Sequence, residues 1–309
     1  MECGYKMKQS VIDSTFLKRK SEELQIPFSN LLAGYVLEEV VRLLFESGFK
    51  EYLWIENSQI LGLEQYRRKN DLILKLKYRE SSKKLEPNKL VPGQKLSRLL
   101  GLALIAIVFG ADQNSMISWK GNAVQKGNCV EVYLNAALEE MEVPVYLQIE
   151  PIAYENLIPE KKKLQMTLNQ KKTVTYYQYP YETVLAENLF EVMEKMELVP
   201  DMKTFDTIYS ILCEQAMNGR HVLEILTKLC EVKPVVKKEE RLKEIASYAD
   251  YSYMRKRWEK YVRHHKREKI SWQEVMKKFQ SFMKPLWHAV CCDEIFFDDW
   301  MPELGRYLG

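Results

Sequence analysis

The stretch that decides the fold is YRRKNDLILKLKY, residues 66–78. Its apolar and polar side chains alternate with a period of two, which predicts a strand with one buried face. One face carries Leu72, Leu74 and Leu76, and the other carries Asp71, Ile73 and Lys75. An acid at the start of such a strand has two interpretations. Asp71 is either an exposed residue at the edge of a sheet or a metal ligand whose second acid is missing.

The composition is that of a globular protein of one large or two smaller domains. The chain has 309 residues, 46% of them hydrophobic and 29% charged, with a formal net charge of +3 that implies no partner. Its six cysteines show no CxxC spacing, which favours reduced thiols and a cytoplasmic protein. The longest apolar run, residues 99–111, is too short to span a membrane. We therefore expect a buried helix there and no membrane association.

The hydrophobic pattern changes character near Tyr179. Before it, helical periodicity in residues 26–49 and 99–111 is interspersed with strand-like segments. Those segments are residues 51–61, 70–78, 115–121, 129–138, 143–152 and 173–181. After it, every long apolar segment has helical periodicity. The sequence predicts an α+β fold: a mixed sheet with flanking helices in residues 1–179, and a helical C-terminal domain in residues 180–309.

A basic segment, Arg255–Lys269, lies within the helical half and carries eight Lys or Arg residues and two Glu residues. Trp258, Tyr261 and Val262 fall on one stripe of the helix it would form. One interpretation is an amphipathic helix that buries this stripe and solvates its charges. The other is a surface that contacts the phosphate backbone of RNA or DNA.

The residues alone give a partial set of ligands for phosphoryl transfer. The sequence contains no Gly-rich phosphate loop, no HExxH and no GxSxG motif. Two-metal transfer needs several carboxylates around a pair of Mg²⁺ ions, and a strand with Asp-x-Asp supplies two on one face. Here Asp71 is followed by Ile73, and Glu150 near the end of a later strand is the candidate neighbour.

Four motifs, taken in order, carry a resemblance to a known family. They are RRKNDLI at 67–73, IEPIAYENLIP at 149–159, YETVLAEN at 181–188 and MKTFDTIYSI at 202–211. Over residues 10–285 the chain resembles the AbiEii/AbiGii-type abortive-infection toxins, a branch of the nucleotidyltransferase-fold superfamily. YETVLAEN is the most specific match, at the start of the first C-terminal helix. The resemblance implies a nucleotidyltransferase-like fold, with Mg²⁺ and a nucleoside triphosphate as ligands.

The resemblance also implies roles for individual residues. Asp71 stands at the first metal acid of the family and Glu150 at the third, so these two are the candidate catalytic and metal-binding residues. The candidate nucleotide-binding residues are Asn57, Ser58, Arg67, Glu187 and Lys203. Arg67, Glu187 and Lys203 match the residues of the family pattern. Asn57 and Ser58 stand where the family has two glycines that let the backbone approach the triphosphate.

Several family residues are replaced. Ile73 stands at the second metal acid, and Asn188 stands at a lysine that would meet phosphate. Side chains at Asn57 and Ser58 would crowd the phosphates. These replacements speak against binding of Mg²⁺ and of a nucleoside triphosphate, and they predict a protein that keeps the fold with weak or no activity.

The expected role is phage defence or a toxin–antitoxin-type system, with an antitoxin-like protein as partner. One alternative is an active Mg²⁺-dependent nucleotidyltransferase that modifies RNA with a reduced site, using Asp71 and Glu150 on one metal. Another is a non-enzymatic module that binds a protein or binds RNA through Arg255–Lys269.

Overall fold

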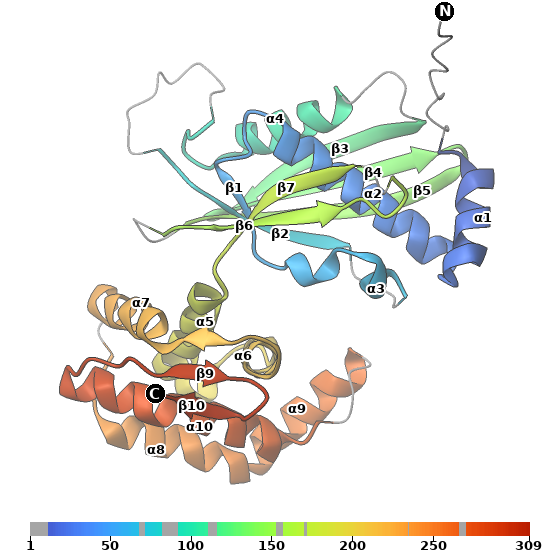
Figure 1. Cartoon of the computed structure of the whole chain (residues 1–309). Coiled ribbons are helices and arrows are strands. Elements are labelled where there is room, and N and C mark those ends of the chain that lie inside the picture. The colour runs from blue at the N-terminus through green and yellow to red at the C-terminus, as the bar shows by residue number, and fades with distance from the viewer. Residues whose placement is uncertain are drawn as a thin grey trace, which may run out of the picture. The chain divides into compact units, whose positions relative to one another are not determined.

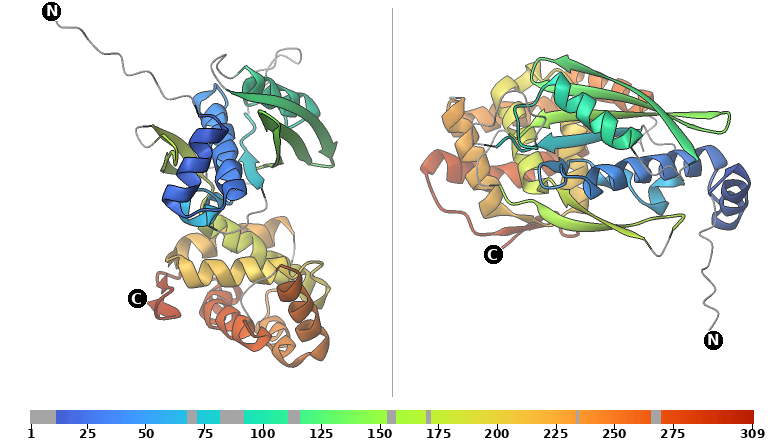
Figure 2. Two further views of the ribbon diagram at one scale, coloured as in Figure 1. Left: turned by 90° about the vertical axis from the view of Figure 1, so that its right-hand side faces the viewer. Right: turned by 90° about the horizontal axis from the view of Figure 1, so that it is seen from above.

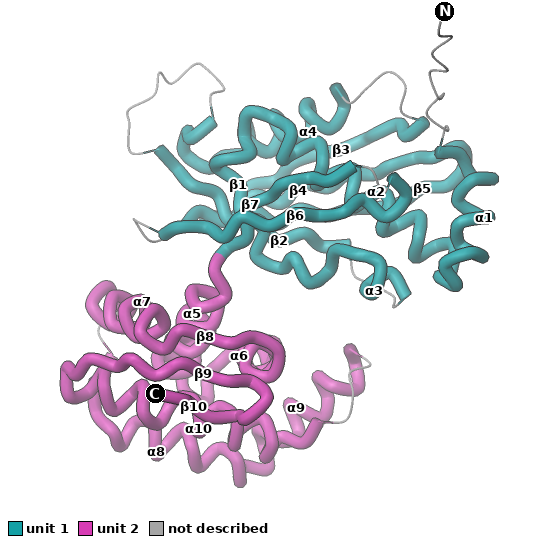
Figure 3. Tube along the Cα trace, in the orientation of Figure 1, with its two compact units in different colours: residues 1–179 teal, residues 180–309 magenta. Residues whose placement is uncertain are grey.

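The computed structural model describes residues 12–67, 72–81, 92–110, 116–152, 157–169, 172–233, 235–265 and 270–309. The chain divides into two compact units, an N-terminal unit of residues 1–179 and a C-terminal unit of residues 180–309 (Figure 3). No helix within the described ranges is both long enough and apolar enough to cross a membrane. Asp71, one of the predicted site residues, lies outside the described residues.

The N-terminal unit contains a seven-stranded mixed sheet with helices (Figure 1). Its helices are α1 (Ser14–Leu24), α2 (Phe28–Glu46), the short η1 (Ser58–Ile60), α3 (Leu63–Tyr66) and α4 (Arg98–Phe109). Its strands are β1 (Leu53–Ile55), β2 (Ile73–Tyr78), β3 (Ile117–Lys126), β4 (Cys129–Leu138), β5 (Met141–Pro151), β6 (Glu160–Gln165) and β7 (Thr173–Gln178). The strand order is β3-β4-β5-β2-β1-β7-β6. The pairs β2/β5 and β1/β7 are parallel and the other neighbours are antiparallel.

Strand β2 lies at the centre of this sheet and shows the alternation that its sequence predicts. Leu74 and Leu76 are fully buried, whereas Ile73 on the other face is 40% exposed. Helices α2 and α4 cover one face of the sheet (Figure 2). Their apolar residues form one continuous core with the strands, Leu74 and Leu76 included. The remaining face of β2 carries Ile73, Lys75 and Lys77, and we call it the polar face.

A buried carboxylate fixes the segment between β1 and β2 onto α2. Glu38 of α2 is fully buried and accepts hydrogen bonds from the Tyr66 hydroxyl at 2.9 Å and from the backbone N–H and side-chain hydroxyl of Thr167 at 2.8 and 2.6 Å. Burial raises the pKa of Glu38 in spite of these three donors. The ring of Tyr66 lies directly over Gly34, where a Cβ atom would approach its carbons to 2.6 Å.

The C-terminal unit is mainly helical, as predicted. Its helices are α5 (Tyr181–Lys195), η2 (Met196–Leu198), α6 (Lys203–Glu214), α7 (Gly219–Val232), α8 (Glu239–Ser247), η3 (Tyr248–Asp250), α9 (Ser252–His264) and α10 (Trp272–Cys292). Three short strands, β8 (Met217–Asn218), β9 (Asp299–Met301) and β10 (Arg306–Leu308), form a small sheet in the order β10-β9-β8. The predicted fold class, a mixed sheet with flanking helices followed by a helical region, is confirmed.

Four buried tryptophans hold the C-terminal unit together. Each indole N–H donates to a backbone carbonyl of another segment at 2.8–3.0 Å, so these large apolar rings are buried with their polar group satisfied. The donor and acceptor pairs are Trp258–Ile270, Trp272–Tyr248, Trp287–Lys238 and Trp300–Leu212. Trp300 thereby fixes the C-terminal hairpin of β9 and β10 onto the end of α6.

Gly34→Ala should destabilise the fold, because the added methyl group would overlap the Tyr66 ring. We expect a loss of about 1–3 kcal/mol in the free energy of unfolding, measured by urea titration. Gly48→Ala is the matched control, since the nearest atom to its added Cβ is 3.9 Å away. Equal stability of the two variants would contradict the described packing of Tyr66.

Candidate functional site

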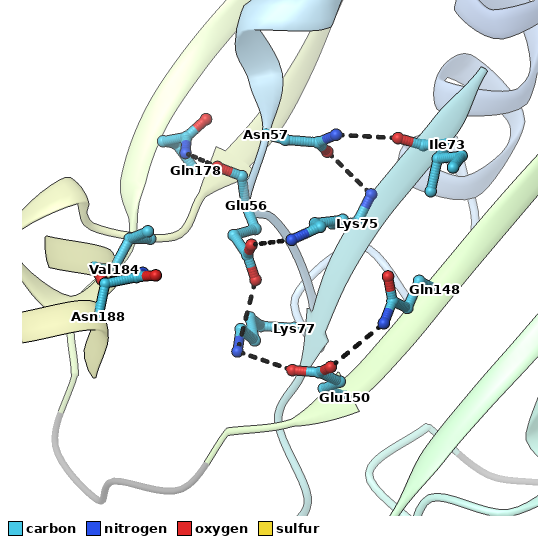
Figure 4. A network of polar contacts seen from close by, with 10 residues as sticks. All are labelled: Glu56, Asn57, Ile73, Lys75, Lys77, Gln148, Glu150, Gln178, Val184 and Asn188. Atoms are coloured by element: carbon cyan, nitrogen blue, oxygen red, sulfur yellow. Dashed lines mark hydrogen bonds and ion pairs between the residues drawn. The ribbon is translucent and has the colours of Figure 1, made fainter. Parts of the chain in front are cut away.

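Two lysines and two glutamates form an ion-pair cluster on the polar face of the N-terminal sheet (Figure 4). Glu56 directly follows β1, Lys75 and Lys77 lie on β2, and Glu150 lies on β5. The strand register places Glu150 opposite Lys77, so three neighbouring strands bring the four charges together. We call these four residues the lysine cluster.

Lys77 is the centre of the lysine cluster. Its ammonium Nζ lies 3.0 Å from Glu150 Oε2 and 3.4 Å from Glu56 Oε2, while Lys75 Nζ lies 3.1 Å from Glu56 Oε1. Gln148 Nε2 donates to the other oxygen of Glu150 at 3.4 Å. The Lys77 ammonium also lies 5.3 Å from the ring centroid of Tyr179, a cation–π distance.

Burial makes these contacts more than ordinary surface ion pairs. The Lys77 side chain is 9% exposed and that of Glu56 is 17% exposed, whereas Glu150 is 42% exposed. Burial opposes ionisation of the Glu56 carboxyl, but the charges of Lys75 and Lys77 outweigh it, and the pKa of Glu56 is lowered. A buried ammonium without a counter-charge would be costly, so Lys77 needs both carboxylates.

Asn57 and Ser58 occupy the place where the family resemblance predicts a glycine-lined phosphate site. The Asn57 side-chain amide donates to the carbonyl of Ile73 at 2.9 Å, and its oxygen accepts from the backbone N–H of Lys75 at 2.8 Å. Asn57 thus extends the pairing of β1 and β2 by one residue with its side chain. Ser58 begins the short helix η1. Neither residue has the positive φ that would require glycine.

The register separates Glu150 from the position of the second family acid. Ile73 lies opposite Tyr146, and Glu150 lies opposite Lys77, four residues further along β2. At about 3.3 Å per residue this is roughly 13 Å. Tyr146 packs edge-on against Tyr133 of β4, with ring centroids 5.4 Å apart. The part of the polar face beside Ile73 is therefore aromatic.

The other predicted site residues lie on different elements of the chain. Arg67 pairs with Glu64 at 3.7 Å, and both side chains are more than half exposed, which makes the pair weak. Glu187 lies half-buried on α5, and Lys203 lies exposed at the start of α6, where its backbone N–H bonds Asp201. Glu187 and Lys203 belong to the C-terminal unit, and Asn57, Ser58, Arg67 and Glu150 belong to the N-terminal unit.

Asn188 and Thr204 have structural partners inside the C-terminal unit. Asn188, at the position of a lysine, donates to the carbonyl of Val184 at 2.7 Å. Thr204 of α6 is buried and donates to Glu191 at 2.8 Å. Both side chains form hydrogen bonds within the same unit, and these bonds stabilise the helices without any ligand.

The lysine cluster offers little to a metal ion. Its two carboxylates and two ammonium groups balance to zero charge, and Mg²⁺ prefers an excess of oxygen ligands with negative charge. Within the described ranges, Glu56 and Glu150 belong to no set of three His, Cys, Asp or Glu side chains that converge as metal ligands. A phosphate would likewise have to separate Lys75 and Lys77 from the carboxylates.

The alternation in the sequence predicts which face of the strand carries Lys75 and Lys77. The two lysines alternate with the leucines along the strand, so they lie on the face that also carries Asp71, the candidate metal ligand. Two positive charges on the same face as a candidate metal ligand oppose the binding of a metal ion there. The sequence pattern does not predict a role for Glu56, because its contacts with Lys75 and Lys77 depend on the pairing of β1 and β2.

The basic helix α9 buries part of the stripe predicted from its sequence. Trp258, Val262 and Met254 are buried. The Tyr261 hydroxyl donates a hydrogen bond to the carboxylate of Asp206 at 2.9 Å. Arg257 donates to the carbonyl of Val199 at 2.6 Å. The exposed cations of the described part of the helix are Arg255, Lys256, Lys260 and Arg263.

Comparison with known proteins gives limited similarity. No protein-family model matches the chain, and no curated protein matches it. Two solved structures from Helicobacter pylori, JHP933 and a proposed nucleotidyltransferase, align over 87% of this chain with a TM-score of 0.45 and 11% sequence identity. The alignments cover 94% and 99% of those chains, respectively. Similarity at this level carries no argument about activity or substrate.

Lys77→Met should raise the pKa of Glu56, because burial then opposes ionisation with one ammonium fewer nearby. The pKa is measured from the carboxyl carbon resonance in an NMR titration. We expect the unfolding free energy at pH 7 to fall by about 1–3 kcal/mol. Lys163→Met, at an exposed lysine of β6, is the control and should leave both quantities unchanged. An unchanged Glu56 pKa in Lys77→Met would contradict the cluster.

The same variant should change the response to acid. In the native protein the pKa of Glu56 lies below its ordinary value, so its stabilising contribution is present above about pH 4.3 and is lost as the pH falls through the lower native pKa. Lys77→Met should lose less stability than the native protein across this window. A larger loss in the variant would show that Lys77 does not stabilise the ionised carboxyl.

Proposed function

We propose that this protein is a nucleotidyltransferase-like protein with weak or no catalytic activity, which acts by binding in a phage-defence or toxin–antitoxin-type system. The observation that carries the proposal is the position of the Lys77 ammonium between the carboxylates of Glu56 and Glu150. An ammonium group occupies the place beside Glu150 that a metal ion would need.

Charge and geometry both oppose metal-dependent transfer at this position. A Mg²⁺ ion bound by Glu150 would lie close to Lys77, and the repulsion would add to the loss of the existing ion pair. Mg²⁺ also demands nearly ideal octahedral oxygen geometry, and it dehydrates reluctantly. One carboxylate that already has a partner is a poor substitute for the several acids of a two-metal site.

The defence role rests on the resemblance to abortive-infection toxins, which covers residues 10–285 and is most specific at YETVLAEN. An antitoxin-like protein partner is part of this proposal. Asn57 supports binding without turnover, because its side chain closes the strand end that a triphosphate would approach. The fold can persist without the ligands, since its core does not use them.

RNA binding through α9 is the second candidate function. The exposed cations Arg255, Lys256, Lys260 and Arg263 favour it, since exposed charges are available to phosphates. Trp258 is buried in the unit and is not available to stack on bases. The expected binding is therefore electrostatic and depends little on sequence.

Nucleotide transfer is the direct test of the first proposal. The full chain is incubated with each nucleoside triphosphate, Mg²⁺ or Mn²⁺, and a pool of tRNA, and incorporation of labelled nucleotide is measured. We expect the same background incorporation in the native protein, Asp71→Asn and Glu150→Gln, because none has a competent metal site. Incorporation by the native protein that both substitutions abolish would establish the reduced-site enzyme instead.

RNA binding is tested by a charge-matched pair of double variants. Lys256→Gln with Lys260→Gln should weaken RNA binding and make the dependence of affinity on salt less steep by about two phosphate contacts, measured by filter binding. Lys277→Gln with Lys284→Gln removes the same charge from exposed positions of α10 and should have a smaller effect. Equal effects of the two pairs would leave α9 without a special role.

A further inference from the structure

Three side chains of different chemistry converge at the end of helix α10 in the C-terminal unit. They are the imidazole of His288, the thiol of Cys292 and the carboxylate of Glu294, and one ligand atom from each lies within 4.8 Å of the others. His288 and Cys292 are four residues apart, so they share one face of the helix. The chain then reverses at Asp293, which has a φ of 55°. This reversal brings Glu294 back beside His288, with its N–H bonded to the carbonyl of Ala289 at 2.9 Å.

A fourth residue orients the imidazole. Glu239, in the first turn of α8, has Oε1 2.5 Å from His288 Nδ1. A neutral imidazole that donates from Nδ1 carries its lone pair on Nε2. Nε2 lies 3.9 Å from Glu294 Oε2 and 3.9 Å from Cys292 Sγ.

We propose that His288 Nε2, Cys292 Sγ and the Glu294 carboxylate bind one Zn²⁺ ion, with Glu239 as the carboxylate that holds His288 in place. Nitrogen, thiolate and carboxylate are all ligands of zinc, at about 2.0–2.3 Å, and three protein ligands leave the fourth tetrahedral position for water. A carboxylate on the second imidazole nitrogen is the arrangement that commonly orients zinc-bound histidines. The two atom pairs at 3.9 Å would have to close by about half an ångström to reach tetrahedral spacing, and the third pair, Cys292 with Glu294, lies within 4.8 Å.

The charges also suit a divalent cation. A Cys292 thiolate and the carboxylates of Glu294 and Glu239 contribute three negative charges to the zinc site, which exceed the charge of the ion. The positive charges of Lys243 and Lys284 act on Glu239 and moderate this excess. All three ligands and Glu239 are exposed, which gives an ion access from solvent. Bound zinc would fix the last turn of α10 to the segment that follows it.

Cys291 provides an internal control next to the proposed ligand. It is half-buried, and its thiol does not belong to the set of ligand atoms that converges with His288 and Glu294 among the described residues. Cys291→Ser and Cys292→Ser therefore remove the same atom from adjacent positions that differ in access to the site. Circular dichroism of each variant verifies that the helices remain folded.

The test is titration of the metal-free full chain with Zn²⁺ by calorimetry and with Co²⁺ by absorption spectroscopy. We expect one ion per chain and a thiolate-to-cobalt charge-transfer band. Cys292→Ser should abolish that band and Cys291→Ser should retain it. Glu239→Gln should weaken zinc affinity about 10–100-fold, and His288→Gln should weaken it more. Absence of stoichiometric binding, or a band that persists in Cys292→Ser, would overturn the proposal.

Discussion

The ammonium of Lys77, held between two carboxylates, is the interaction on which the polar face of the N-terminal sheet depends. Lys77 is nearly buried, and a charge in that position needs opposite charges close by. Glu56 directly follows β1 and Glu150 lies on β5, so the ion pairs of Lys77 connect three strands. Because the contacts of Lys77 with Glu56 and Glu150 require β1, β2 and β5 to pair in this register, the register of these strands and the chemistry of the face are coupled.

This coupling has a consequence for function. Glu150, which the family resemblance suggests as a metal ligand, pairs here with Lys77 of the same sheet. The amide of Asn57, at the adjacent strand end, bonds the backbone of β2. The proposed function, binding without turnover, rests on this use of Glu150 and Asn57 within the sheet.

The sequence predicted most of the fold and less of the candidate site. The alternation in β2 and the apolar run of α4 each depend on local periodicity, and both elements are present. Strand β6 was missed because it is a lysine-rich edge strand, and edge strands commonly carry such charges. The resemblance directed attention to Glu150, but its partner Lys77 is 73 residues away in the chain. Alternation places Lys77 on the polar face of β2, but its contact with Glu150 depends on the pairing of β2 with β5, which local sequence does not contain.

The central claim is that Lys77, and not a metal ion, is the partner of Glu150. Titration of the isotope-labelled protein with paramagnetic Mn²⁺ tests it most directly, with the side-chain resonances of Glu56, Lys77 and Glu150 observed by NMR. The account predicts that these resonances keep their intensity at Mn²⁺ concentrations that saturate ordinary two-metal sites. Selective broadening of Glu150 at low Mn²⁺, together with release of Lys77, would contradict it.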